Sequence, residues 1–95
     1  MQQNINIGLF GLGVVGQGIV SVMARAKNAH AEIKRICVRD LTKPRDISID
    51  SSILTDNPDE ILLDSDINLI VEVVDNAEAS YRIVTSALRR GIPVV

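Results

Sequence analysis

A glycine-rich turn between an apolar strand and a helix constrains this chain more than any other feature. Residues 5–10 are mostly apolar and lead into Gly-x-Gly-x-x-Gly at residues 11–16, after which apolar residues recur at helical spacing. In a dinucleotide-binding turn, Gly11 permits the sharp change of direction and Gly13 lets a pyrophosphate approach the backbone. Gly16 lets the helix pack closely on the strand, and the helix start faces the phosphates. The context predicts a dinucleotide site made of Gly11, Leu12, Gly13, Val14, Val15 and Gly16.

Length and composition indicate a small α/β domain. The 95 residues are 46% hydrophobic, and Phe10 and Tyr81 are the only aromatic residues, so the core must be aliphatic, as in buried parallel strands. We predict a Rossmann-type parallel sheet flanked by helices. At this length, residues 1–95 are expected to form about one half of a full dinucleotide-binding fold. The sequence stops inside an expected strand, so we expect a truncated domain of a larger protein.

Several classes of protein are disfavoured. The net charge of −2 argues against nucleic acid as a partner. No apolar run reaches the ~18 residues that span a bilayer, and the N-terminus lacks the pattern of a signal peptide. The single cysteine cannot form an internal disulfide, which fits a cytoplasmic location.

Strand and helix signals alternate along the chain, which predicts a parallel sheet with right-handed crossovers. Capping-box spacing marks two helix starts, one at Asn57-Pro58-Asp59-Glu60 and one between Asp75 and Glu78, and Gly91 can stop the last helix. The polar connection at 39–52 contains one candidate short strand at 47–49. The other strands are expected at 4–10, 32–38, 68–74 and from 92, and the helices at 14–27, from 58 to about 64, and up to about Arg90.

Four stretches in the same order carry a resemblance to a known family. They are Gly-Leu-Gly-Val-Val-Gly (11–16), Ile-Cys-Val-Arg-Asp-Leu-Thr-Lys-Pro-Arg (36–45), Leu-Ile-Val-Glu-Val-Val (69–74) and Ala-Leu-Arg-Arg-Gly-Ile-Pro-Val-Val (87–95). The chain resembles the N-terminal nucleotide-binding domain of homoserine dehydrogenase. This resemblance implies reduction of aspartate 4-semialdehyde to homoserine with NADH or NADPH, in threonine and methionine biosynthesis. It also implies that the full-length parent protein is a homo-oligomer. The amino-acid substrate is expected to bind to that parent protein and not to residues 1–95 by themselves.

The sequence departs from the family pattern in two places. Asp75-Asn76 stands where the family usually has Gly-Gly, so the resemblance puts these two side chains beside the cofactor. The Thr-Ala-Asn-Lys segment that follows in the family, and the catalytic lysines beyond it, are not in these 95 residues. We therefore expect no catalytic residue in this chain and no activity from it alone.

Basic residues follow the second expected strand, where NAD-specific proteins usually place an acid. Arg39 can bind a 2′-phosphate by charge-assisted hydrogen bonds, which favours NADP over NAD. Lys43 is a second candidate for that pocket and Arg45 a weaker one, while Asp40 is the competing acid. The alternative interpretation is that these residues form a solvated turn.

The remaining polar residues have simpler interpretations. Glu72, inside an apolar strand, lies either near the nicotinamide end of the cofactor or, as we prefer, in structural hydrogen bonds to loop N–H groups. Asp75 and Glu78 are expected to cap a helix. Cys37 is expected to be a small core residue and His30 a surface residue, and no metal site is indicated.

Two other functions stay open at this point. One is the cofactor domain of another dehydrogenase acting on a small carbonyl compound or an amino acid. The other is a non-enzymatic NAD(P)-sensing domain of a regulator or channel gate, which the departure at Asp75-Asn76 favours. Hydride transfer by the parent protein would distinguish an enzyme from a sensor.

Overall fold

The computed structural model describes residues 4–26 and 30–95, and its strands lie in one parallel sheet. Within these residues the sheet has four strands in the order β3-β2-β1-β4. They are β1 (Ile5–Phe10), β2 (Ala31–Cys37), β3 (Leu54–Thr55) and β4 (Leu69–Glu72). The helices are α1 (Val14–Ala26), α2 (Asp59–Leu62) and α3 (Ala77–Arg89), with a 3₁₀ turn η1 (Ser51–Ile53) before β3. The predicted Rossmann-type α/β sheet is confirmed.

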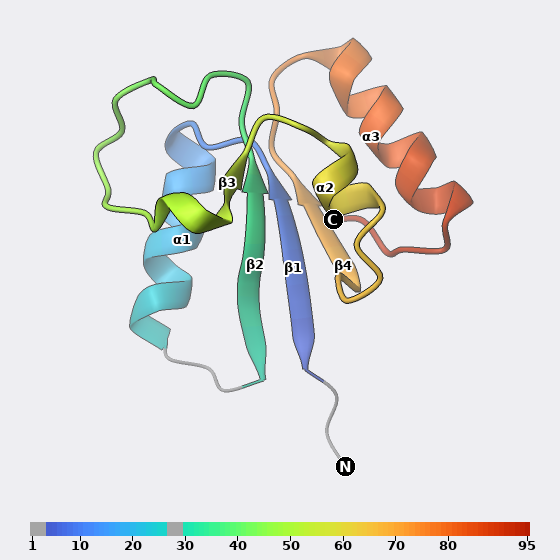
Figure 1. The fold of residues 1–95 in the computed structure, drawn as a ribbon, viewed down its shortest axis with the longest axis horizontal. Helices are drawn as coiled ribbons and strands as arrows, with labels where there is room; N and C mark the ends of the chain where they lie inside the picture. The colour runs from blue at the N-terminus through green and yellow to red at the C-terminus, as the bar shows by residue number, and fades with distance from the viewer. Residues whose placement is uncertain (1–3, 27–29) are drawn as a thin grey trace.

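Helices cover both faces of this sheet, with α1 on one face and α2 and α3 on the other (Figure 1). Successive side chains of a strand point to opposite faces, so Leu9 and Phe10 of β1 each contribute to a different core. Leu9 packs with the fully buried Ile36 on the α1 side. Phe10 packs on the other side with Ile61 of α2 and Ile83 of α3. The sheet is therefore held between two aliphatic layers.

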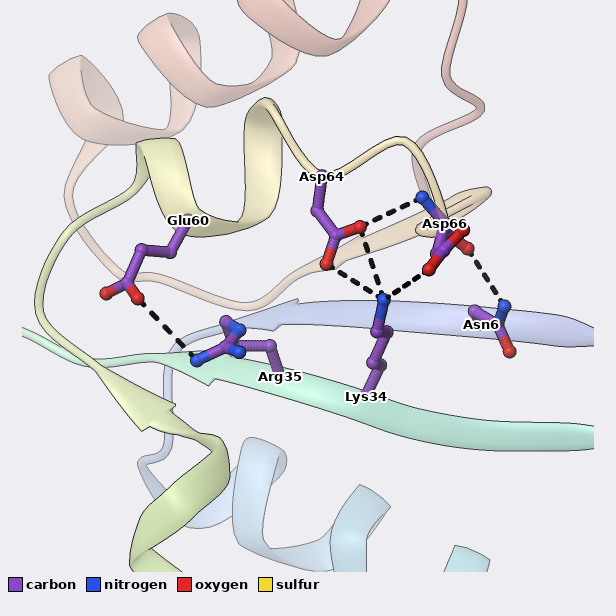
Figure 2. Close-up of polar contacts among 6 residues, drawn as sticks. All are labelled: Asn6, Lys34, Arg35, Glu60, Asp64 and Asp66. Atoms are coloured by element: carbon purple, nitrogen blue, oxygen red, sulfur yellow. Dashed lines mark hydrogen bonds and ion pairs between the residues drawn. The ribbon is translucent and has the colours of Figure 1, made fainter.

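One irregularity in β2 changes which of its side chains face which helices. Ile7 of β1 pairs with Ile33, but the next residue, Gly8, pairs with Arg35, so Lys34 is an extra residue. An extra residue shifts the alternation of side chains by one position. As a result Lys34 and Arg35 both point toward the face that carries α2 (Figure 2).

Ion pairs join this part of β2 to α2 and to the segment that follows it (Figure 2). Lys34 Nζ lies 3.0 Å from Asp64 Oδ2 and 3.1 Å from Asp66 Oδ2. Arg35 Nη1 lies 3.7 Å from Glu60 Oε1. Hydrogen bonds to the two aspartates raise the pKa of Lys34. Pairs that are this exposed stabilise a fold little, so we interpret them as setting the position of α2 along the sheet.

The connection between β2 and β3 differs from the prediction. The strand expected at 47–49 is wrong, because the pairing with β2 falls instead on Leu54–Thr55. Before that pairing the chain turns at Asp50, whose side chain accepts a hydrogen bond from Ser52 N–H (2.9 Å) and caps η1. Ile49 packs against the core on the α1 side, so its apolar character reflects burial in a loop rather than a strand.

The start of α2 agrees with the prediction only in part. Asn57 Oδ1 accepts a hydrogen bond from Asp59 N–H (3.0 Å), as a capping residue does. The reciprocal role expected of Glu60 is wrong, because the Glu60 carboxylate accepts from the Thr55 hydroxyl instead. Thr55 Oγ1 in turn accepts from Asn57 N–H (3.0 Å). The helix ends at Leu62, two residues before the expected position.

The remaining predicted ends lie close to the observed ones. α3 ends at Arg89, and Gly91 has a φ of +74°, as expected of a glycine that stops a helix. Val94 forms a parallel bridge with Ile70 of β4, within the strand that was expected to begin at residue 92. The end of α1 expected near Lys27-Asn28 lies outside the described residues. Among the described helices, none combines the length and the apolar character that crossing a membrane requires.

The same substitution to alanine should have opposite effects on the free energy of unfolding at two of the glycines. A Cβ on Gly8 would overlap Ile61 Cγ2 of α2, so Gly8→Ala should lower the free energy of unfolding by about 1–3 kcal/mol. Gly18 is an exposed position within α1, so Gly18→Ala should raise the free energy of unfolding by about 0.5–1 kcal/mol. Urea denaturation of both variants measures the difference. Equal effects would show that α2 does not pack on β1 as described.

Candidate functional site

The glycine turn after β1 has a backbone that only glycine adopts easily. Gly11 has a φ of +104°, and a Cβ there would lie 3.0 Å from the carbonyl oxygen of Val73, after β4. Gly11 N–H donates a hydrogen bond to the carbonyl of Cys37 at the end of β2 (3.0 Å). The turn is thus in contact with the ends of both strands that flank β1.

The other two glycines of the motif differ in what the fold requires of them. A Cβ on the buried Gly16 would overlap the carbonyl oxygen of Gly11, so α1 packs directly against the turn. The Cβ position of Gly13, by contrast, has no heavy atom of the described residues within 4 Å, and Gly13 is exposed. Packing therefore accounts for Gly11 and Gly16, whereas Gly13 leaves open space on the outside of the turn.

The residues between and after these glycines form the start of α1. The Leu12 side chain is buried in the α1-side core, so only its backbone is available at the turn. Val14 and Val15 begin the helix and are 91% and 62% exposed. The first N–H groups of a helix have no partner within it, and the helix dipole makes this end positive. The start of α1 is therefore suited to an anion.

A second part of the candidate site follows β2. Arg39 and Lys43 are exposed, and within residues 4–26 and 30–95 neither side chain makes a hydrogen bond or ion pair. Asp40 Oδ1 accepts hydrogen bonds from Thr42 N–H (2.9 Å) and the Thr42 hydroxyl (2.7 Å). The hydroxyl contact is the main cause that lowers the pKa of Asp40. The carboxylate of Asp40, the acid that competes with Arg39, is thus already hydrogen-bonded within its own loop.

Arg45 has a structural role in that loop. Its guanidinium donates to the carbonyls of Lys43 and Asp40, each at 2.8 Å. These bonds close residues 40–45 into a compact turn. They leave Arg45 less suited to a phosphate than Arg39 or Lys43.

A third part follows β4, where the prediction for Asp75 is wrong. Asn76, not Asp75, is the N-cap of α3, and its Oδ1 accepts from Ala79 N–H (2.9 Å). A cap reaches the N–H three residues on, and α3 begins at Ala77, so the Asp75–Glu78 spacing is out of step by one residue. Asp75 is exposed, and its carboxylate has no hydrogen bond or ion pair among the residues that the structure describes.

Glu72, at the end of β4, fixes this third segment, and the structural interpretation of it is confirmed. Its Oε1 accepts from Val74 N–H (2.9 Å), and its Oε2 accepts from the Ser80 hydroxyl of α3 (2.8 Å). The carboxylate therefore links the strand, the following loop and the helix. Because β1, β2 and β4 are parallel, the loops after them lie at the same edge of the sheet (Figure 1).

Gln17 joins two parts of the site, and the sequence analysis missed it. Its Nε2 donates to the Leu12 carbonyl (3.1 Å), and its Oε1 accepts from Asp46 N–H (3.1 Å). The sequence does show that Gln17 is a polar residue one helical turn after Gly13. It lies on the side of α1 that faces the rest of the protein. That signal identifies no partner, because Asp46 is far away in the chain.

Cys37 and His30, the other candidate residues, form no catalytic or metal-binding group with the described residues at this edge of the sheet. Cys37 is buried, and burial raises the pKa of its thiol to about 11, so the thiolate is scarce at neutral pH. His30 is exposed in the turn before β2. Within the described ranges, no three His, Cys, Asp or Glu residues come together as a metal site.

Comparison with known proteins places these features in context. Residues 11–95 match the family described as "Homoserine dehydrogenase, NAD binding domain". The homoserine dehydrogenase of Bacillus subtilis (strain 168) is 32% identical over 92 residues, which cover 90% of this chain and 21% of that protein.

Solved structures agree with the sequence comparison. The crystal structure of S. aureus homoserine dehydrogenase at pH 7.0 matches 97% of this chain with a TM-score of 0.86 and 34% identity. That of a homoserine dehydrogenase from Thiobacillus denitrificans matches 98% with a TM-score of 0.77 and 30% identity. The chain covers 25% and 23% of those two structures, so it spans about a quarter of the length of these relatives.

Proposed function

Because this chain belongs to the family of homoserine dehydrogenase NAD-binding domains, we propose that residues 1–95 form the cofactor-binding part of such an enzyme. The enzyme would interconvert aspartate 4-semialdehyde and homoserine. One observation carries the proposal: Gly13 lies exposed beside open space at the start of α1, between two glycines that packing requires. The motif needs that space for a pyrophosphate.

The residues of the turn fit a dinucleotide. The backbone N–H groups of Val14 and Val15 would hold the pyrophosphate at the positive end of α1, as anions are held at other helix starts. A bound nicotinamide supplies the site that gives or accepts the hydride, and the protein binds and orients it. Residues 11–95 match the NAD-binding domain of the family, so we expect no hydride transfer to substrate from these 95 residues alone.

Preference for NADP over NAD rests on Arg39 and Lys43. Both are exposed cations whose side chains make no hydrogen bond or ion pair with the described residues, whereas Asp40 is bonded to Thr42. A 2′-phosphate would give Arg39 charge-assisted hydrogen bonds that a ribose hydroxyl cannot match. Lys43 would add a second positive charge without the planar geometry of Arg39.

Asp75 opposes the binding of an anion. Its carboxylate follows β4 by three residues, and Val73 of the same loop touches the glycine turn. Because Asn76 and not Asp75 caps α3, the Asp75 carboxylate makes no hydrogen bond or ion pair with the described residues. We propose that it weakens the attraction of this edge for a dinucleotide.

Gly13→Val should abolish binding of NADP and NAD while the chain stays folded. The branched side chain would occupy the space reserved for the pyrophosphate. Gly18→Val is the matched control, since Gly18 is exposed like Gly13 but lies within α1, beyond residues 11–16 of the site. Calorimetric titration measures affinity and circular dichroism measures folding. Unchanged affinity in folded Gly13→Val would remove the turn from the site.

Arg39→Ala should weaken NADP binding more than NAD binding. A charged hydrogen bond contributes roughly 1.5–3 kcal/mol when desolvated, and the exposed position of Arg39 should give less. Parallel titrations with the two nucleotides measure the difference. A loss of the same size for both would show that Arg39 does not contact the 2′-phosphate.

Asp75→Asn should tighten NADP binding, because it removes a negative charge without changing the size of the side chain. The gain should shrink as salt is added, since salt screens exposed charges. Glu78→Gln changes the net charge equally on the first turn of α3 and serves as the control. Equal gains in both variants would indicate a general charge effect, and no gain in Asp75→Asn would place Asp75 away from the cofactor.

A further inference from the structure

Within residues 4–26 and 30–95, the Gln17 side chain provides the one hydrogen-bonded link between the glycine turn and the loop after β2. Its amide uses both ends, donating to the carbonyl of Leu12 and accepting from the N–H of Asp46. Leu12 belongs to the turn, and Asp46 belongs to the loop that begins at Arg39. Gln17 itself lies on α1, in a half-buried position.

The loop that Gln17 holds is a closed unit. Asp40 is bonded to Thr42, and Arg45 is bonded to the carbonyls of Asp40 and Lys43. Asp46 follows Arg45 directly, so a bond to Asp46 N–H anchors the whole turn rather than one residue. Hydrogen bonds therefore connect Leu12 to Gln17 and Gln17 to Asp46, the chain connects Asp46 to Arg45, and Arg45 bonds to the carbonyl of Asp40, next to Arg39.

We propose that Gln17 is a positioning residue that fixes Arg39 and Lys43 relative to the glycine turn and thereby favours NADP over NAD. This inference rests on the proposed function, because the glycine turn would hold the pyrophosphate and Arg39 the 2′-phosphate. The two phosphates of NADP belong to one molecule, so the spacing of their protein partners determines whether both are contacted at once.

The consequence differs for the two cofactors. NAD has no 2′-phosphate and gains nothing from a correctly placed Arg39. Without the Gln17 link, the loop has to be ordered when NADP binds, and ordering long charged side chains and backbone costs free energy. Gly11 and Gly16 are constrained by their close approach to Val73 and to the Gly11 carbonyl, so we expect the pyrophosphate site to keep its shape when the Gln17 bonds are removed.

Calorimetric titration of the chain with NADP and with NAD tests this role. Gln17→Met keeps the length of the side chain and removes both hydrogen bonds. We expect it to weaken NADP binding about 3- to 10-fold, the range for loss of neutral hydrogen bonds, and to leave NAD binding within about twofold. Ser21→Ala, one turn further along α1, is the matched control and should change neither affinity.

The effect of Gln17 should shrink when Arg39 is absent, because Gln17 acts through Arg39 and Lys43. In an Arg39→Ala background, Gln17→Met should weaken NADP binding less than it does in the wild type, a non-additivity that a general loss of stability does not produce. Equal losses for NADP and NAD in the single variant, or additive losses in the double variant, would overturn the proposal.

Amide hydrogen exchange separates this inference from the proposed function. In the nucleotide-free chain, Asp46 N–H should exchange faster in Gln17→Met than in the wild type. If both nucleotides bind but Asp46 exchange is unchanged, the link is wrong and the inference fails alone. If the wild type binds neither nucleotide, the proposed function fails and the role in specificity fails with it, whatever the exchange of Asp46 shows.

Discussion

The contact between α1 and the turn after β1 determines most of this structure. Gly16 packs so closely on the carbonyl of Gly11 that a side chain there would require a shift of the backbone, and Gly11 itself is constrained by its positive φ and by the nearby Val73 carbonyl. The same turn contacts Val73 after β4 and bonds to Cys37 at the end of β2. Because one turn contacts the ends of both flanking strands, the loops after β1, β2 and β4 are brought to one edge, which is where open α/β sheets bind ligands.

Local patterns in the sequence were sufficient for the framework and for this turn. The glycine motif, the apolar run at 69–74 and the stop at Gly91 each depend on a few neighbouring residues, and each is found where it was expected. The family resemblance is confirmed, since it rested on four such stretches in the right order. The structural interpretation of Glu72 was correct because a carboxylate in an apolar strand needs hydrogen-bond partners, whichever residues follow the strand.

Features that depend on residues far apart in the chain, or on the exact residue at which a helix begins, could not be predicted from local sequence patterns. The extra residue at Lys34 follows from pairing with β1, and β3 forms only where β2 offers an edge. The choice of Asn76 over Asp75 as the cap is local, but it depends on the residue at which α3 begins, which the capping-box spacing alone does not determine. Gln17 shows the limit most clearly, because the residue that it binds, Asp46, lies 29 positions away in the chain.

An NMR titration of the chain with NADP tests the central claim, that the cofactor binds at the turn after β1, most directly. The account predicts that the backbone amides of residues 11–16 and of Arg39 change their chemical shifts together and saturate at the same concentration. The depression between α2 and α3, which includes Leu62 and Ser86, should stay unchanged. Shifts confined to that depression, or no shift at the glycine turn, would contradict the account.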